Sequence, residues 1–236
     1  MIKKIPIYLK KIKNKNKILL FIYIFIIFVG MAKTYFYEAK ETFSMPVANK
    51  RIYIDAGHGQ WDPGKVAKDG TLEKDINLSI SKYLQGYLEQ SGGFVLTTRV
   101  DDKSLSDKKR EDLRERKNIA NNEQVDLFVS IHQNSFPKES VKGAQVFYYK
   151  GSEESKKLAE FVQAKLSNID KGNKRVAKEN KDYYILRETK MPSIIVECGF
   201  LSNQQENTML KDEKYQKEIA WAIYSGILDY YNAEKI

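Results

Sequence analysis

The stretch Asp126-Leu-Phe-Val-Ser-Ile-His-Gln-Asn134 decides the fold, because it combines a buried strand with a histidine at its end. A short continuous apolar run between polar residues is typical of a strand that is covered on both faces. The run at residues 52–54 has the same character, is closed by glycines, and is followed by His58. The sequence therefore predicts a buried sheet with a histidine beyond each of two strands.

Helical patterns alternate with such strands along the chain. The predicted strands are residues 52–54, 94–99, 126–131, 143–149, 183–186 and 193–196, with a loop at 171–181. The predicted helices are residues 74–90, a charged helix capped by Ser106 that runs to about Asn121, a helix that opens at Ser152, and residues 213–231. This alternation predicts one α/β domain with a largely parallel sheet and right-handed crossovers.

The formal charge of +9 belongs to the N-terminal leader. Seven lysines precede residue 18, whereas no acidic residue occurs before Glu38. Residues 33–236 carry 33 basic and 31 acidic side chains, a net charge of only +2. Such a balance lacks the basic footprint of a nucleic-acid-binding protein, so we expect no nucleic-acid partner.

The leader also contains an apolar core. Residues 18–32 are uncharged and mostly apolar; they are shorter than the roughly 20 residues of a membrane span and typical of a signal peptide. A short uncleaved anchor is the alternative, and both imply export. We predict a leader or anchor at 1–32, a tether at 33–50 and a folded domain at 51–233. The single cysteine, Cys198, excludes an internal disulfide.

The chain has only two histidines, and both follow predicted strands. His58 lies in Asp55-Ala-Gly-His-Gly59, and His132 lies in Ser130-Ile-His-Gln-Asn134. Ligands of α/β sheets gather beyond the carboxyl ends of the strands, and imidazole is the commonest metal ligand in proteins. We therefore predict a metal site at this edge of the sheet. Two hydrogen-bonded structural histidines are the alternative.

Glu197 ends the apolar run Ile194-Ile-Val-Glu197. Desolvation at such a position raises the pKa of a carboxyl group, which is how a glutamate becomes a general acid or base near neutral pH. An ion pair with Arg99 or Arg187 is the alternative. Four carboxylates remain open as the third metal ligand: Asp62, Asp69, Glu73 and Asp75.

Three other chemistries fit the sequence less well than this metal site. A Cys–His hydrolase would use Cys198, but neighbouring strand residues point to opposite faces, so Cys198 faces the core when Glu197 faces the site. The glycine-rich residues 57–64 lack the Gly-Lys-Ser/Thr ending of a phosphate loop. A zinc carboxypeptidase would place a glutamate three residues after its first histidine, where this chain has Trp61.

The residues from Arg51 to Tyr231 closely resemble the zinc-dependent N-acetylmuramoyl-L-alanine amidases. The matching segments are Ile54-Asp-Ala-Gly-His-Gly59, Asp62-Pro-Gly64, Leu72-Glu-Lys-Asp75, Thr98-Arg99, Ala120-Asn121, Ser130-Ile-His-Gln-Asn134 and Pro192 to Asn203. Gly143-Ala-Gln-Val-Phe147 is most similar to the sporulation branch, which trims spore-cortex peptidoglycan for germination. Gln60, where a second glycine is usual, and Cys198 depart from the family pattern.

The resemblance implies one zinc ion bound by His58, Glu73 and His132, with Glu197 as the catalytic glutamate. It implies a mixed, largely parallel sheet of about six strands flanked by helices. The expected reaction is hydrolysis of the amide between the lactyl group of muramic acid and L-alanine of the stem peptide. Arg187 would orient a stem-peptide carboxylate or form a surface ion pair. A wall-binding protein without activity is the rival, and the presence of all four site residues argues against it.

The expected partners are peptidoglycan and, through the N-terminal segment, a membrane. The protein is expected to be anchored or secreted on the side of the cell wall or spore cortex. The chain ends soon after its last predicted helix without a wall-binding repeat, so we expect an envelope accessory protein to localise and control it. The alternative is that affinity for the substrate and the compartment are sufficient, without an accessory protein.

Overall fold

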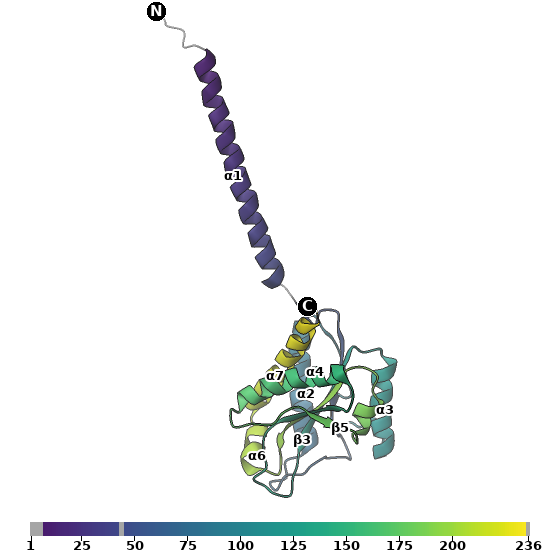
Figure 1. Ribbon diagram of the computed structural model, residues 1–236. Coiled ribbons are helices and arrows are strands. Elements are labelled where there is room, and N and C mark those ends of the chain that lie inside the picture. The colour runs from purple at the N-terminus through teal and green to yellow at the C-terminus, as the bar shows by residue number, and fades with distance from the viewer. Residues whose placement is uncertain (1–6, 43–44, 235–236) are drawn as a thin grey trace, which may run out of the picture. The chain divides into compact units, whose positions relative to one another are not determined.

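The computed structural model describes residues 7–42 and 45–234, with side chains described for residues 15–33 and 45–234. The chain divides into two compact units at Met45 and Pro46, and each is described by itself. The first unit holds helix α1 (Ile7–Thr42). The second holds the sheet and the remaining helices (Figure 1).

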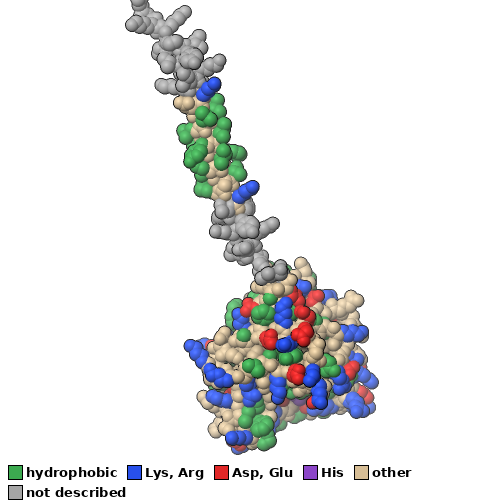
Figure 2. Space-filling view, viewed as in Figure 1, with side chains coloured by type: hydrophobic (Ala, Val, Ile, Leu, Met, Phe, Trp, Pro, Cys, Tyr) green, Lys and Arg blue, Asp and Glu red, His purple; other side chains and the backbone are tan. Residues whose placement is uncertain are grey.

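Helix α1 contains an apolar segment from Lys15 to Lys33 that is long enough to cross a membrane, although signal sequences pass the same test. Its large side chains are exposed, as Phe21 and Phe25 illustrate, and they form a green band between lysines in Figure 2. The helix continues past residue 32 to Thr42, so the predicted tether is partly helical. The division into leader, tether and domain at residues 32 and 50 stays a prediction.

The second unit is built on one six-stranded sheet with the order β2-β1-β3-β6-β4-β5. The strands are β1 (Arg51–Ala56), β2 (Phe94–Thr97), β3 (Leu127–Asn134), β4 (Gln145–Tyr149), β5 (Lys178–Asn180) and β6 (Ser193–Phe200). All neighbours pair in parallel except β4 and β6, which are antiparallel. The predicted mixed, largely parallel α/β sheet of about six strands is confirmed.

Helices cover both faces of this sheet. They are α2 (Glu73–Gln90), α3 (Lys109–Asn122), α4 (Glu153–Ile169), α5 (Tyr184–Glu188), α6 (Gln204–Leu210) and α7 (Glu213–Ala233). The larger apolar core lies under α2, α4 and α7, and the smaller one lies under α3 and α5, which Figure 1 shows on the other side. Along β6 the two cores alternate: Ile194 and Val196 enter the larger core, and Ile195 enters the smaller one.

The sequence-based assignment fails at several short elements, and it gives no element for residues 204–210, which form helix α6. Tyr183–Leu186, predicted as a strand, forms the short helix α5, because a run of four residues carries too little periodicity to separate the two structures. Residues 178–180, predicted within a loop, form strand β5 on the edge of the sheet. The charged helix begins at Lys109, and its N-cap residue is Lys108 rather than Ser106. The Ser106 hydroxyl instead accepts the Lys108 N–H, 3.2 Å away.

Strands β3 and β6 are longer than predicted. They extend to Asn134 and Phe200, so His132 and Glu197 lie within strands rather than beyond them. The two residues are direct partners in the parallel register, and the register shifts immediately afterwards, between His132 and Asn134. This pairing brings the two predicted site residues side by side.

Close packing of α4 against α7 depends on Gly226. A Cβ at this position would lie 2.6 Å from the Val162 Cα, a distance that forces the two helices apart. We therefore predict that Gly226→Ala lowers the free energy of unfolding by about 1–3 kcal/mol, the usual cost of overpacking. Gly86→Ala is the matched control, because nothing lies within 4 Å of its added Cβ.

In the control, replacing a helical glycine by alanine should stabilise by up to about 1 kcal/mol. Urea unfolding followed by circular dichroism measures both changes. Equal effects of the two substitutions would contradict the packing account.

Candidate metal centre and active site

Two buried arginines hold the loop that carries His58. Arg116 donates to the carbonyl oxygens of Ala56 at 3.0 Å and His58 at 2.8 Å. Arg99 donates to the carbonyl oxygens of Ala56 at 3.0 Å and Gly57 at 3.1 Å. His58 has φ of 62°, a left-handed conformation that is uncommon outside glycine. The loop keeps this conformation because both arginines donate hydrogen bonds to its carbonyl oxygens.

The charge of Arg116 is balanced inside the domain. Its side chain is 2% exposed and bonds Asp55 at 2.7 Å and Asp112 at 2.5 Å. Asp55 also accepts hydrogen bonds from Ser130 and Thr98, both at 2.6 Å. Although burial acts to raise the pKa of Asp55, Arg116 and these hydroxyls lower it to about 2. The pair is therefore ionised, and removing one partner would leave a buried charge at a cost of about 3–5 kcal/mol.

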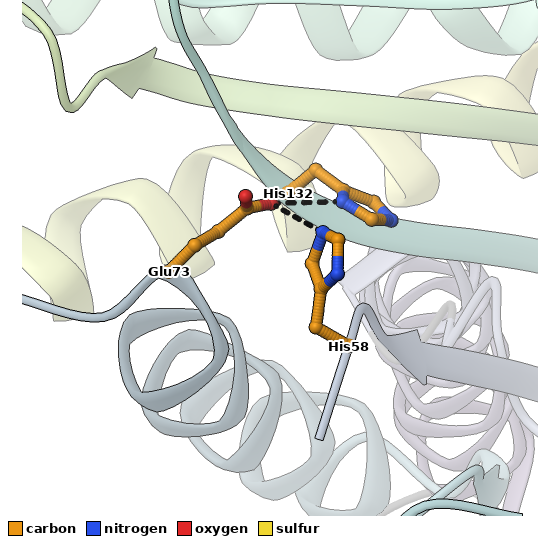
Figure 3. A group of neighbouring side chains, drawn as sticks. All are labelled: His58, Glu73 and His132. Atoms are coloured by element: carbon orange, nitrogen blue, oxygen red, sulfur yellow. Dashed lines mark hydrogen bonds and ion pairs between the residues drawn. The ribbon is translucent and has the colours of Figure 1, made fainter. Parts of the chain in front are cut away.

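His58, Glu73 and His132 converge on one point, as Figure 3 shows. Glu73 Oε1 lies 3.2 Å from His58 Nε2 and 2.9 Å from His132 Nδ1. One ligand atom from each of the three residues lies within 4.8 Å of the others. They come from three separate parts of the fold: the loop after β1, the first residue of α2, and strand β3.

The Glu73 carboxylate is fixed by the backbone as well as by the imidazoles. Its oxygens accept the N–H groups of Lys65 at 2.8 Å and Gln133 at 3.1 Å. Burial acts to raise the pKa of Glu73, but the hydrogen bonds and charges of His132 and His58 outweigh it and hold the pKa below its usual value. Glu73 is therefore present as a carboxylate, which is the form that binds a metal.

Two glycines shape the space around this cluster. A Cβ on Gly57 would lie 2.2 Å from His132 Cε1, and a Cβ on Gly64 would lie 2.6 Å from Glu73 Oε2. On the outer side, His58 Nδ1 lies 2.9 Å from Asp62 Oδ2. A carboxylate on the second ring nitrogen is the usual way in which proteins orient a metal-binding histidine. Two imidazoles and one carboxylate are also the donor set of many catalytic zinc sites, so these residues fit such an ion.

The structure separates the four carboxylates that the sequence left open. Asp62 lies against His58 and outside the cluster. Asp69 pairs with Lys211 at 2.6 Å, and Asp75 is exposed on α2. Only Glu73 of these four groups joins both histidines.

Glu197 lies next to His132 and has an unsatisfied carboxyl oxygen. Its side chain is buried, and Oε2 has no hydrogen-bond partner among the described residues. The suggested ion pairs are not formed, because Arg99 binds backbone carbonyls and Arg187 pairs with Glu188 at 2.9 Å. Burial raises the pKa of Glu197 to about 7, with the neighbouring Glu73 acting in the same direction and the imidazoles opposing it. This carboxyl group is poised to exchange a proton near neutral pH.

Cys198 lies on the opposite face of β6, as the alternation of strand residues predicts. It is buried with Ile194 and Val196 in the larger core, and burial raises the pKa of its thiol. A thiol in this position has no thiolate character at neutral pH. The Cys–His chemistry therefore has no support in the structure.

Sequence reasoning missed Arg116 and Tyr183. From the sequence alone, a buried arginine cannot be distinguished from surface arginines in a helix as charged as α3. The one available indication is Asp55, because a carboxylate at the end of an apolar strand is expected to have a positively charged partner. Burial, followed by the charges of Glu197 and Glu73, raises the pKa of Tyr183 to about 12. Its hydroxyl therefore stays protonated beside the site.

Known proteins share this domain. The model of the N-acetylmuramoyl-L-alanine amidase family matches residues 52–229. The germination-specific N-acetylmuramoyl-L-alanine amidase of Bacillus subtilis (strain 168) is 38% identical over 197 residues, which cover 80% of this chain and 83% of that protein. The solved CwlD amidase from Clostridioides difficile, in complex with the GerS lipoprotein, is 45% identical with a TM-score of 0.75. That match covers 78% of this chain and 100% of the solved chain.

A further solved structure, the catalytic domain of the amidase CwlV from Bacillus (Paenibacillus) polymyxa var. colistinus, is 32% identical with a TM-score of 0.70. It covers 78% of this chain and 98% of its own. The chain therefore belongs to the N-acetylmuramoyl-L-alanine amidase family. It is a hydrolase that acts on peptidoglycan, and its relatives include the germination-specific branch.

The close approach of Gly57 to the His132 ring leads to a prediction about metal binding. We expect Gly57→Ala to weaken binding of a divalent ion by about 10–100-fold, the scale seen when the groups that orient a ligand are altered. The reason is that the added methyl group displaces the His132 ring. Competition with a zinc chelator measures the affinity, and Gly86→Ala serves as the control. Native affinity in a folded Gly57→Ala protein would contradict the geometry.

Proposed function

We propose that this protein is a zinc-dependent hydrolase of the amide bond between N-acetylmuramic acid and L-alanine of the stem peptide. The observation that carries the proposal is the pairing of the His58–Glu73–His132 cluster with a buried, unsatisfied Glu197 on the adjacent strand. Metal ligands beside a carboxyl group of raised pKa are the combination that metal-assisted hydrolysis requires. His58, Glu73 and His132 would hold one zinc ion.

The proposed chemistry divides between the ion and Glu197. When bound, zinc supplies a Lewis acid that polarises a carbonyl group and lowers the pKa of water. Glu197 accepts a proton from the attacking water and returns it to the alanine nitrogen as the C–N bond breaks. The products are a lactyl carboxylate on muramic acid and a stem peptide with a free amine. The protonated Tyr183 hydroxyl nearby is able to donate a hydrogen bond to the oxygen of the reacting carbonyl.

We further propose that the reaction serves spore-cortex modification for germination. The support is the similarity to the germination-specific amidase of Bacillus subtilis and to CwlD of Clostridioides difficile. We place the domain outside the cytoplasm, secreted or anchored on the side of the cell wall or cortex. The apolar Lys15–Lys33 segment, with exposed apolar side chains, supports contact with a membrane through the N-terminal unit.

An envelope accessory protein is the third part of the proposal. The CwlD relative was solved in complex with the GerS lipoprotein. In this chain the three proposed ligands come from a loop, a helix terminus and a strand, and a site assembled from separate elements gains affinity when those elements are held together. We propose that a partner protein docks on the domain and supports zinc binding.

Two substitutions distinguish the proposed general base from a proposed metal ligand. We predict that Glu197→Gln keeps the fold and the zinc but lowers turnover by at least about 10²-fold, the scale of a lost general base. His132→Ala should lose both zinc and turnover, because it removes a ligand. Elemental analysis gives the zinc content, and mass spectrometry of digested peptidoglycan gives the products.

Glu160→Gln, an exposed glutamate on α4, is the control and should behave as wild type. Near-native turnover in Glu197→Gln would make that residue structural. Full zinc occupancy in His132→Ala would exclude the histidine as a ligand.

The accessory protein is tested with the full chain in detergent. Because the ligands lie on separate elements, we expect the isolated protein to retain zinc substoichiometrically and to regain stoichiometric zinc and higher turnover when an envelope extract is added. Heat-treated extract is the control. Stoichiometric zinc and full turnover of the isolated chain would remove the need for a partner.

A further inference from the structure

A basic recess of about 330 Å³ lies beside the beginning of strand β4. Three cationic side chains line it: Lys142, Lys174 and Arg175. None of the three forms an ion pair with a carboxylate among the described residues. Asp170 also lines the recess and offsets one of these three charges, and one of its oxygens accepts the Gly172 N–H at 2.8 Å. The side chains that line the recess therefore carry an excess of positive charge.

The walls of this recess are held in place by buried groups. Asn173 is 8% exposed; it donates to the Ala144 carbonyl oxygen at 2.9 Å and accepts the Arg175 N–H at 3.0 Å. Gly143 has φ of 101°, and a Cβ there would lie 2.7 Å from Asn173 Oδ1. The Gly143 N–H donates to the buried Glu206 at 2.9 Å. Hydrogen bonding and the close approach at Gly143 thus join the two segments that form the recess, residues 142–143 and 170–175.

Arg175 is oriented without a carboxylate partner. Its Nε donates to the Lys142 carbonyl oxygen at 2.9 Å, and its Nη1 donates to Gln145 Oε1 at 2.9 Å. Its guanidinium carbon lies 4.8 Å from the centre of the Phe200 ring. Since a guanidinium has five N–H donors, three remain, which is enough for a bidentate bond to a carboxylate. The side chain is preorganised for an anion that the chain does not supply.

The recess lies at the same end of the sheet as Glu197. Gln145 is the direct register partner of Glu197 in the antiparallel pair of β4 and β6, so the two side chains share one face. The Gln145 amide points away from β6, because it bonds Arg175 and the Val176 carbonyl oxygen. Two strand spacings of about 5 Å each then separate Glu197 from the recess. An extended peptide spans this distance with about three residues.

We propose that the Lys142–Lys174–Arg175 recess binds a carboxylate of the stem peptide that carries the scissile amide. This inference rests on the proposed function, since it assigns to the recess the peptide side of that substrate. A stem peptide with the amide at Glu197 reaches the recess with its second or third residue. The recess thereby selects stem peptides with a free carboxylate over peptides in which that group is amidated.

Arg175 thus takes the role of binding a stem-peptide carboxylate, whereas Arg187 forms the surface ion pair that the sequence analysis gave as the other possibility for it. Arg187 is exposed and already pairs with Glu188, an arrangement that contributes little on a surface. Arg175 differs in being half-buried, oriented by two side-chain hydrogen bonds and free of an acidic partner among the described residues.

The test compares Arg175→Gln with Lys181→Gln, an exposed lysine outside the recess that carries the same charge change. The substrates are a muramoyl tripeptide with free carboxylates and the same tripeptide with its carboxyl groups amidated. We expect Arg175→Gln to lower kcat/KM for the free-carboxylate peptide about tenfold or more, chiefly through KM, as for a lost hydrogen bond to a charged group. Its kcat/KM for the amidated peptide should stay at the wild-type value, as should both values for Lys181→Gln.

Binding of the free stem tripeptide, the product, is measured in parallel by calorimetry. Weaker tripeptide binding in Arg175→Gln, with no turnover by any form of the protein, would support the recess and overturn the proposed function instead. Wild-type kcat/KM and wild-type tripeptide binding in a folded Arg175→Gln protein would overturn the recess. An equal loss on both substrates would also overturn it, because it would mark a structural role.

Discussion

The site depends on one interaction, the buried bond network of Arg116. This side chain joins Asp55 at the end of β1 to Asp112 on α3, and it holds the carbonyl oxygens on both sides of Gly57. Without such donors a loop that places His58 at positive φ would relax to a more common conformation. His58 would then no longer face Glu73 and His132. The cost of burying a guanidinium is offset by its two carboxylate partners, Asp55 and Asp112.

The register of the sheet supplies the second constraint. The parallel pairing of β3 with β6 sets His132 beside Glu197, and the antiparallel pairing of β4 with β6 sets Gln145 on the other side of Glu197. The proposed metal ligand His132, the proposed proton-transfer group Glu197, and Gln145, which bonds Arg175 of the basic recess, therefore follow each other across three neighbouring strands. A shift of one residue in either pairing would turn Glu197 toward the core, where Cys198 lies.

Much of this arrangement follows from the sequence, and the exceptions have physical causes. The apolar strands predicted the α/β sheet, and His58, His132 and Glu197 stood out because each is polar beside a buried run. Glu73 could not be chosen by spacing from four nearby carboxylates; the family resemblance selected it, and the fold brings it to the histidines. Strand β5 was not predicted and helix α5 was predicted as a strand, because both segments are short and their patterns are ambiguous. Arg116 and Arg175 were missed because their roles arise from tertiary contacts that leave no periodic signal.

The central claim is that the cluster of His58, Glu73 and His132 holds the catalytic ion beside Glu197. The most direct measurement is anomalous X-ray diffraction at the zinc absorption edge from crystals of the zinc-loaded protein. The account predicts one strong peak within about 2.0–2.3 Å of one nitrogen from each histidine and of a Glu73 oxygen, the usual range of zinc–ligand distances. A peak at another set of side chains, or none at this cluster in fully zinc-loaded protein, would contradict it.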